Sequence, residues 1–287
     1  SNGLLLWRFA RNFRRKIFVF IKMKQIGIFL IILLLFINCD LKKKQNLKSK
    51  LIEASWQSLF NGKDLDNWIV KINGHKLHDN FKNTFRVENG ILKVSYDGYE
   101  SFGNRFGLLT YKTPFSNYKF RLQYRFTGTQ TKGGESWAIK NSGVMIHSQA
   151  PESMLLDQAF PLSLEVQLLG GTSPNTPRPT GNLCTPATHV SVNNILVTDH
   201  CINANSETYY GEEWVALEII VTKEKITHKI NGNSVITYTN PSIGGQFLEA
   251  TSKEIQLKDG QSLTSGYISL QSESHPIEFK NIEILEL

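Results

Sequence analysis

The sequence predicts an all-β protein whose strands form a two-sheet, jelly-roll sandwich. Three observations lead to this fold class. After Trp56, apolar and polar residues alternate with a period of two, no segment keeps a 3.6-residue period over about twelve residues, and Gly, Asn and Pro separate the short segments. Roughly a dozen short strands with such turns are typical of a sandwich or jelly roll.

The predicted strands follow one another with turn residues between them. Thr84 to Val87 and Ile91 to Tyr96 form a hairpin around Asn89-Gly90, because this dipeptide adopts the positive φ angles of a tight turn. Tyr118 to Phe126 alternates strictly, as expected for a half-buried strand. The remaining predicted strands are 164–168, 215–222, 225–230, 234–238, 267–271 and 277–285.

The composition divides the chain into an N-terminal segment (1–39), a polar tether (40–55) and a single sandwich domain (56–287). The chain holds 32 Lys and Arg against 25 Asp and Glu. Its first 50 residues contain twelve of the basic residues and one of the acidic ones. The rest therefore holds 20 basic and 24 acidic residues and is mildly acidic. This charge argues against a nucleic-acid partner and permits a neutral ligand such as a sugar.

The N-terminal segment is expected to direct export. Met23 is the expected start, with 1–22 as an extension before it, and Ile26 to Ile37 is an apolar run that suits a signal peptide and is too short to span a bilayer. A lone Cys39 and a lysine-rich stretch follow, as in bacterial lipoproteins, although Asn38 stands where a small residue is usual. We expect a lipid anchor at Cys39 that holds the protein to the bacterial cell envelope, in the periplasm or at the outer membrane; an ordinary signal peptide is the alternative.

Cys184 and Cys201 are the two cysteines of the predicted domain, 17 positions apart. In an exported protein, an isolated pair of cysteines predicts a disulfide. Two free thiols or a metal site are the alternatives, and no Cys-x-x-Cys spacing favours a metal.

Candidate functional residues come from strand faces, because the sequence contains no GxSxG, HExxH, P-loop or dinucleotide-binding motif. Glu165 and Gln167 share one face of the strand 164–168, with Leu164, Val166 and Leu168 on the other face. A carboxylate and an amide would then project into a groove if that face is concave. The alternative is an ordinary solvated sheet face.

Three histidines widen the set of candidates. Asn141 begins a turn that runs into a strand ending near His147, and Gln271, Glu273 and His275 have the i, i+2, i+4 spacing of one strand face. Such a face could bind a sugar, a divalent metal ion, or nothing. A metal site would need His147, His189, His275 and Glu165 to converge.

Among the aromatic residues, Trp137 lies in a Gly-rich stretch and is the expected wall of a binding site. Trp68 and Trp214 are expected in the core, because sandwich cores also require large rings.

Several segments together resemble one known family, the 3-keto-disaccharide hydrolases. They are SLFNGKDLDNW, TFRVENGILKVSYDGY, the NSG of KNSGVMIHSQAPESM, LEVQLLGG, RPTGNLCTP and GYISLQSESHPIEFKNIEI. The resemblance extends from Trp56 to Leu287. It implies a concanavalin-like (laminarin-binding-type) jelly roll in a secreted or lipid-anchored bacterial protein.

The resemblance also implies an enzyme that cleaves glycosides oxidised at C3 of the sugar. A C3 ketone acidifies the C2 hydrogen, so a base can remove that proton, the C1 substituent leaves, and water can add back. On this basis we expect Glu165 to be the base or a ligand of a divalent metal ion, and His147 or His275 to be the acid or to stabilise the enolate.

Sugar hydroxyls are expected to bind Asn141, Gln167 and Gln271, with Glu273, Trp137 and His189 as further substrate-binding candidates. The family commonly ends with Gln-x-His before its last strand, whereas Glu273 stands at that third position here and His275 follows two residues later.

Two other functions remain open at this point. A non-catalytic carbohydrate-binding module is the main alternative, because the same sandwich serves many lectin-like domains. A structural or docking surface protein is the third reading. A lone carboxylate in a groove favours an enzyme, and a site lined mainly by aromatic rings favours binding alone.

Overall fold

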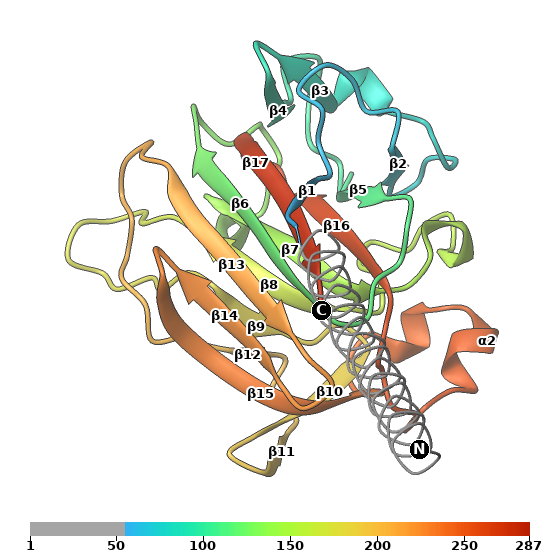
Figure 1. The fold of residues 1–287 in the computed structure, drawn as a ribbon. Helices are drawn as coiled ribbons and strands as arrows, with labels where there is room; N and C mark the ends of the chain where they lie inside the picture. The colour runs from blue at the N-terminus through green and yellow to red at the C-terminus, as the bar shows by residue number, and fades with distance from the viewer. Residues whose placement is uncertain (1–54) are drawn as a thin grey trace, which may run out of the picture. The chain divides into compact units, whose positions relative to one another are not determined.

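A computed structural model describes residues 55–287, and Trp56–Leu287 forms one compact unit. The expected signal segment and the lipidation candidate Cys39 lie outside these residues. Within the described part, two antiparallel sheets pack face to face as a sandwich (Figure 1), which confirms the predicted all-β jelly roll. No helix in 55–287 is both long enough and apolar enough to cross a membrane.

The larger sheet has ten strands in the described chain. They are Gln57–Ser58 (β1), Phe85–Glu88 (β3), Ile91–Val94 (β4), Tyr118–Phe126 (β6), Thr188–Val192 (β10), Ile195–Val197 (β11), Val215–Val221 (β13), Ile226–Ile230 (β14), Asn233–Ile243 (β15) and Ile277–Glu286 (β17). Their order is β11-β10-β15-β14-β13-β6-β17-β4-β3, and β1 pairs with β17.

The smaller sheet has seven strands and carries the candidate site. They are Trp68–Ile72 (β2), Gly107–Tyr111 (β5), Asn141–Ser148 (β7), Leu164–Leu169 (β8), Asn182–Cys184 (β9), Cys201–Ile202 (β12) and Tyr267–Ser272 (β16). Their order is β12-β9-β8-β7-β16-β5-β2. The helices of the described residues are single turns: Phe81–Asn83 (η1), Ser136–Ala138 (η2), Pro151–Ser153 (η3), Leu248–Ala250 (η4) and Lys253–Gln256 (α2).

The period-two alternation decides which side chains fill the space between the sheets. In β6, the buried positions alternate with partly exposed ones, so that its aromatic and leucine side chains point inward. In β8, Leu164, Val166 and Leu168 are fully buried in the same core. Glu165 and Gln167 therefore project from the opposite face of β8, away from the larger sheet, as predicted.

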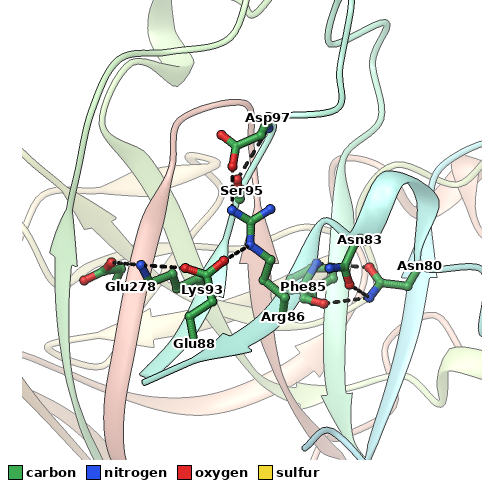
Figure 2. A network of polar contacts seen from close by, with 9 residues as sticks. All are labelled: Asn80, Asn83, Phe85, Arg86, Glu88, Lys93, Ser95, Asp97 and Glu278. Carbon is green, nitrogen blue, oxygen red and sulfur yellow. Dashed lines mark hydrogen bonds and ion pairs between the residues drawn. The ribbon is translucent and has the colours of Figure 1, made fainter. Parts of the chain in front are cut away.

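Charged side chains cover the outer face of the larger sheet. Figure 2 shows Lys93 between two carboxylates, with its Nζ 3.0 Å from Glu88 and 3.1 Å from Glu278. Arg125 lies on the other side of Glu278 at 2.7 Å. Because each carboxylate has a cationic partner, this face is a paired ionic surface, in contrast to the candidate site described below.

Trp68 lies in the core as predicted, and its indole N–H donates to the carbonyl of Leu59. The expectation for Trp214 was wrong. Its ring lies under the cations of Arg125 and Lys280, 4.6 and 3.9 Å from the ring centroid, and it is partly exposed. The tryptophan precedes β13 and stacks with cations of the outer face instead of entering the core.

The predicted disulfide is present and joins Cys184 of β9 to Cys201 of β12. The two residues are direct partners in the β9–β12 pair, and Cys184 is also the strand partner of Glu165. The bridge therefore fastens the edge of the seven-stranded sheet beside the strand that bears Glu165. The enclosed segment carries β10 and β11, which belong to the other sheet.

Replacing both Cys184 and Cys201 with Ala is expected to lower the free energy of unfolding by about 3 kcal/mol, because the bridge closes a short loop in the unfolded chain. Thermal unfolding with and without dithiothreitol measures the effect. The reductant should lower the midpoint of the wild type and leave the double variant unchanged. Equal loss in both proteins would mean that the reductant acts elsewhere.

Candidate functional site

The candidate site lies on the face of the seven-stranded sheet that points away from the core. In register, Gly143 of β7 pairs with Gln167 of β8, and the pairing of Leu270 with Val144 brings Gln271 of β16 to the other side of Gly143. Two glutamines thus flank a position without a side chain. The Glu165 carboxyl fills part of that space, because a Cβ atom on Gly143 would lie 2.6 Å from its Oε1. Any larger residue at 143 would displace the carboxyl group.

Glu165 opens into a cavity of about 250 Å³. Its polar lining comes from Glu165, Asn141, Gln167 and His200, and the Cys184–Cys201 bridge forms part of the wall. The rest of the wall is formed by Trp137, Phe160, Pro186 and Phe247. We call this space the Glu165 cavity. A neighbouring cavity of about 410 Å³ shares Trp137, Asn141 and Gln167 with it and adds Arg178.

Two buried carboxyl groups dominate the electrostatics. Burial raises the pKa of Glu165 to about 8. Burial, and then repulsion from Glu165, raises the pKa of Glu273 well above its usual range, while Arg178 and the Gln271 amide pull it down. The Gln271 amide donates to Glu273 Oε1 at 3.0 Å. Carboxyl groups with raised pKa values can hold a proton at neutral pH, as an acid in catalysis requires.

Arg178 organises the end of the site through backbone carbonyls. Its Nη1 donates to the carbonyl oxygens of Ile139, Lys140 and Gly170 at 2.6, 3.1 and 2.7 Å, and its Nη2 donates to that of Trp137 at 3.1 Å. Burial lowers the pKa of Arg178, and the charge of Glu273 raises it. The guanidinium therefore joins the start of β7 to the end of β8 and supplies a positive charge facing Glu273.

Several polar atoms of the site are buried without a hydrogen-bond partner among residues 55–287. They include Asn141 Oδ1, Gln271 Oε1 and Glu273 Oε2. Buried polar atoms in folded proteins are almost always satisfied, and clusters of unsatisfied ones are typical of binding sites. Together with Gln167, these atoms form a set of donors and acceptors suited to a ligand rich in hydroxyl groups.

The structure brings Glu165, Asn141, Gln167, Gln271, Glu273 and Trp137 together around this part of the sheet, but not His147. That residue has a left-handed backbone (φ 47°) at the end of β7 and packs against Gly266, where a side chain would collide with it. His147 instead lines a separate cavity of about 520 Å³, together with residues that include Ser116, Thr222, Pro241 and Ser262. The regular alternation of side-chain directions along β7 is interrupted here, because the β16 pairing shifts register beside it.

His275 and His189 also lie outside the Glu165 cavity. Ser274 has φ 82°, so the chain turns after Glu273 and His275 does not continue the strand face. The His275 ring packs against Phe126 of the larger sheet, 5.7 Å between centroids, and burial lowers its pKa to about 4. His189 lies on β10 with its ring against Gly244 and Gly245. The three predicted histidines therefore do not converge with Glu165 on one cavity.

His200 and Arg178 were missed by the sequence reasoning, as were Phe160 and Phe247. His200 immediately precedes Cys201, so the predicted disulfide was the one signal that could have located it. Cys184, His200 and Cys201 have their potential ligand atoms within 4.8 Å of one another. The two sulfurs are bonded to each other, so this group does not offer the thiolates that a metal would need.

The fold and the site define a β-sandwich protein with a carboxyl-bearing, amide-lined cleft on one sheet. The profile of the 3-keto-alpha-glucoside-1,2-lyase-like domain matches residues 55–285, and the chain belongs to this family. The family resemblance inferred from the sequence motifs is thereby confirmed. A search of curated proteins gives no match.

Comparison with solved structures gives similar sandwiches at low identity. A candidate glycosyl hydrolase from Parabacteroides distasonis ATCC 8503 is 17% identical, with 81% of this chain and 100% of that chain covered, at a TM-score of 0.47. The carbohydrate-binding module CBM66 from Bacillus subtilis is 8% identical, with 77% of this chain and 96% of that chain covered, at a TM-score of 0.42. The exoplasmic/lumenal domain of VIP36, bound to Ca²⁺ and Man3GlcNAc, is 9% identical, with 82% of this chain and 89% of that chain covered, at a TM-score of 0.48.

Proposed function

We propose that this protein is an exported enzyme that cleaves glycosides carrying a ketone at C3 of the sugar. The reaction removes the C2 proton and expels the C1 substituent, and addition of water then completes net hydrolysis. The observation that carries the proposal is the buried Glu165 carboxyl, held over Gly143 in a cavity lined by amides. Family membership supports the substrate class.

The chemistry of the cavity fits this reaction in two respects. Elimination next to a ketone needs groups that exchange protons near neutral pH, and burial shifts the pKa of Glu165 into that range. Enolate formation also needs hydrogen-bond donors near the developing negative charge, and the amides of Asn141 and Gln167 line the same cavity.

The proposed location is the bacterial cell envelope, with a lipid anchor at Cys39. The Cys184–Cys201 bridge supports it, because disulfides of this kind persist in oxidising compartments. Labelling of the full chain with a radioactive fatty acid tests the anchor. Incorporation should be lost in Cys39→Ala and kept in the Cys184→Ala, Cys201→Ala double variant.

The function is tested by incubating the protein with a chromogenic 3-keto-glucoside and measuring release of the aglycone, with and without a chelator. Wild type should release the aglycone, and Glu165→Gln should slow release by about 100-fold or more, because proton transfer by a positioned group contributes that much. Glu278→Gln is the matched control, since both glutamates are 6% exposed and Glu278 lies on the opposite sheet. Loss of release upon chelation would show that a divalent metal ion takes part.

A non-catalytic carbohydrate-binding module is the second candidate, favoured by the aromatic wall. Trp137 stacks on Phe106 at 5.9 Å and 7°, and Phe106 in turn contacts Phe160, which contacts Phe247. Such rings can bind a sugar face without chemistry. Saturable binding of a 3-keto-glucoside by calorimetry, with no aglycone released over days, would favour this candidate over the enzyme.

A further inference from the structure

The Glu165 cavity contains one histidine, His200, which lies between the disulfide and an aromatic ring. Its imidazole centroid is 5.0 Å from that of Phe247, at an interplanar angle of 61°. Its carbonyl oxygen accepts two hydrogen bonds from Thr185, one from the backbone N–H at 2.8 Å and one from Oγ1 at 3.2 Å. The next residue is covalently joined to Cys184, the strand partner of Glu165.

These contacts fix the backbone of His200. The imidazole Nδ1 is buried and has no hydrogen-bond partner among residues 55–287. No carboxylate forms an ion pair with the ring in that part of the chain, whereas His75 is paired with Asp79. The arrangement is that of a positioned ring whose partner would be a ligand in the cavity.

We propose that His200 and Glu165 divide the proton transfers of the cleavage between them, with His200 accepting the C2 proton and Glu165 protonating the leaving oxygen. This assignment rests on the proposed function and extends it. It also reverses the role expected for Glu165 from the sequence, where the carboxylate was the base.

The step balances as follows in atoms and electrons. The C2–H bond breaks, the proton passes to an imidazole nitrogen of His200, and the electron pair forms the enolate of the C3 ketone. The enolate then forms the C1–C2 double bond as the C1–O bond breaks, and the departing oxygen takes the proton of the Glu165 carboxyl. The products are an unsaturated 3-keto sugar and a free alcohol, and proton return from His200 to Glu165 restores the site. Water adds later across the double bond.

The protonation states agree with this division. Burial lowers the pKa of the His200 imidazole, outweighing an opposing contact of the ring with the Thr185 backbone. The imidazole is thus neutral and can accept a proton at pH 7, while burial keeps the Glu165 carboxyl protonated with its pKa at about 8. A base and an acid in opposite states at one pH are what this pair of proton transfers requires.

The test is carried out in D₂O with a 3-keto-glucoside, following deuterium incorporation at C2 by NMR and aglycone release by absorbance. His200→Gln and His200→Asn should each lose both signals by about 100-fold or more, and Glu165→Gln should lose release while exchange at C2 continues. Added imidazole should restore exchange in His200→Gly. His75→Gln is the matched control, since this histidine is also partly exposed but does not line the cavity, and it should behave as wild type.

Three failures are distinguishable. If the wild type releases aglycone and the folded His200 variants keep both exchange and release, His200 has no such role and the proposed function still holds. If Glu165→Gln loses exchange while His200→Gln keeps it, the roles are the reverse of those assigned. If the wild type neither exchanges nor releases, the proposed function itself fails, and the assignment of His200 fails with it. Thermal midpoints of all variants identify any that do not fold.

Discussion

Replacing Arg178 with Met is expected to lower the free energy of unfolding by roughly 4 kcal/mol. All four carbonyl contacts of its guanidinium are 3.1 Å or shorter, and three of them come from Nη1. Hydrogen bonds from a charged donor contribute about 1.5–3 kcal/mol each. Methionine fills a similar volume and donates nothing, so these carbonyls lose their partner. For a domain of this size, the thermal midpoint should fall by roughly 8–16 °C.

Arg121→Met is the matched control for this prediction. Arg121 pairs with Glu283 at 2.7 Å, but its side chain is 45% exposed on the outer face of the other sheet. Exposed ion pairs contribute about 1 kcal/mol at most, so its midpoint should change by only a few degrees. Similar losses in the two variants would show that Arg178 stabilises the fold no more than a surface arginine does.

Glu165→Gln is expected to make the protein more stable at pH 8 and to have little effect near pH 4.5. Burial raises the pKa of Glu165 from 4.5 to about 8 on folding. Between these pH values the folded protein keeps a proton that the unfolded chain releases, so the free energy of unfolding falls as the pH rises through this window. Each pKa unit corresponds to about 1.4 kcal/mol, and glutamine, which does not ionise, removes this loss.

The measurement is the difference in thermal midpoint between variant and wild type at pH 4.5, 6 and 8. This difference should grow with pH and reach several degrees at pH 8. The thermal midpoint of the variant should itself still fall as the pH rises, because the pKa of Glu273 is also raised. Glu278→Gln is the control with the opposite sign, because Glu278 is paired with Lys93 and Arg125 and its loss destabilises the fold. A difference that does not change with pH would show that Glu165 ionises as readily in the folded protein as in the unfolded chain.

The fold could be predicted because most strands alternate regularly. Tyr118–Phe126 has the predicted bounds, and Ile91–Val94 and Leu164–Leu169 differ from prediction by one or two residues at one end. The strand Asn233–Ile243 runs five residues beyond its prediction, across Asn240 (φ 52°) and Pro241, because pairing with β10 continues past these breakers through a register shift. Short strands such as Ile195–Val197 and Cys201–Ile202 have too few residues to show a period.

The site could be predicted only where one strand determines it. The shared face of Glu165 and Gln167 follows from alternation within β8 and needs no knowledge of its neighbours. His200 lines the same cavity as Glu165 only because the β9–β12 pair and its disulfide bring distant segments together. The predicted histidines failed to converge for local reasons, since His147 and His275 each lie at or beside a residue with positive φ that changes the direction of the side chain.

The order of strands has a consequence for how this protein reaches its folded state. β16 lies between β7 and β5, and β17 lies between β6 and β4, so the last two strands of the described chain occupy interior positions in both sheets. Until they arrive, each sheet has two unpaired edges facing a gap, and such edges pair readily with other chains. The pairings that close the gaps join residues far apart in sequence, which makes folding slow. Gln271 and Glu273 belong to this late segment, so a chain in which it has not yet paired has neither a closed sandwich nor a complete candidate site.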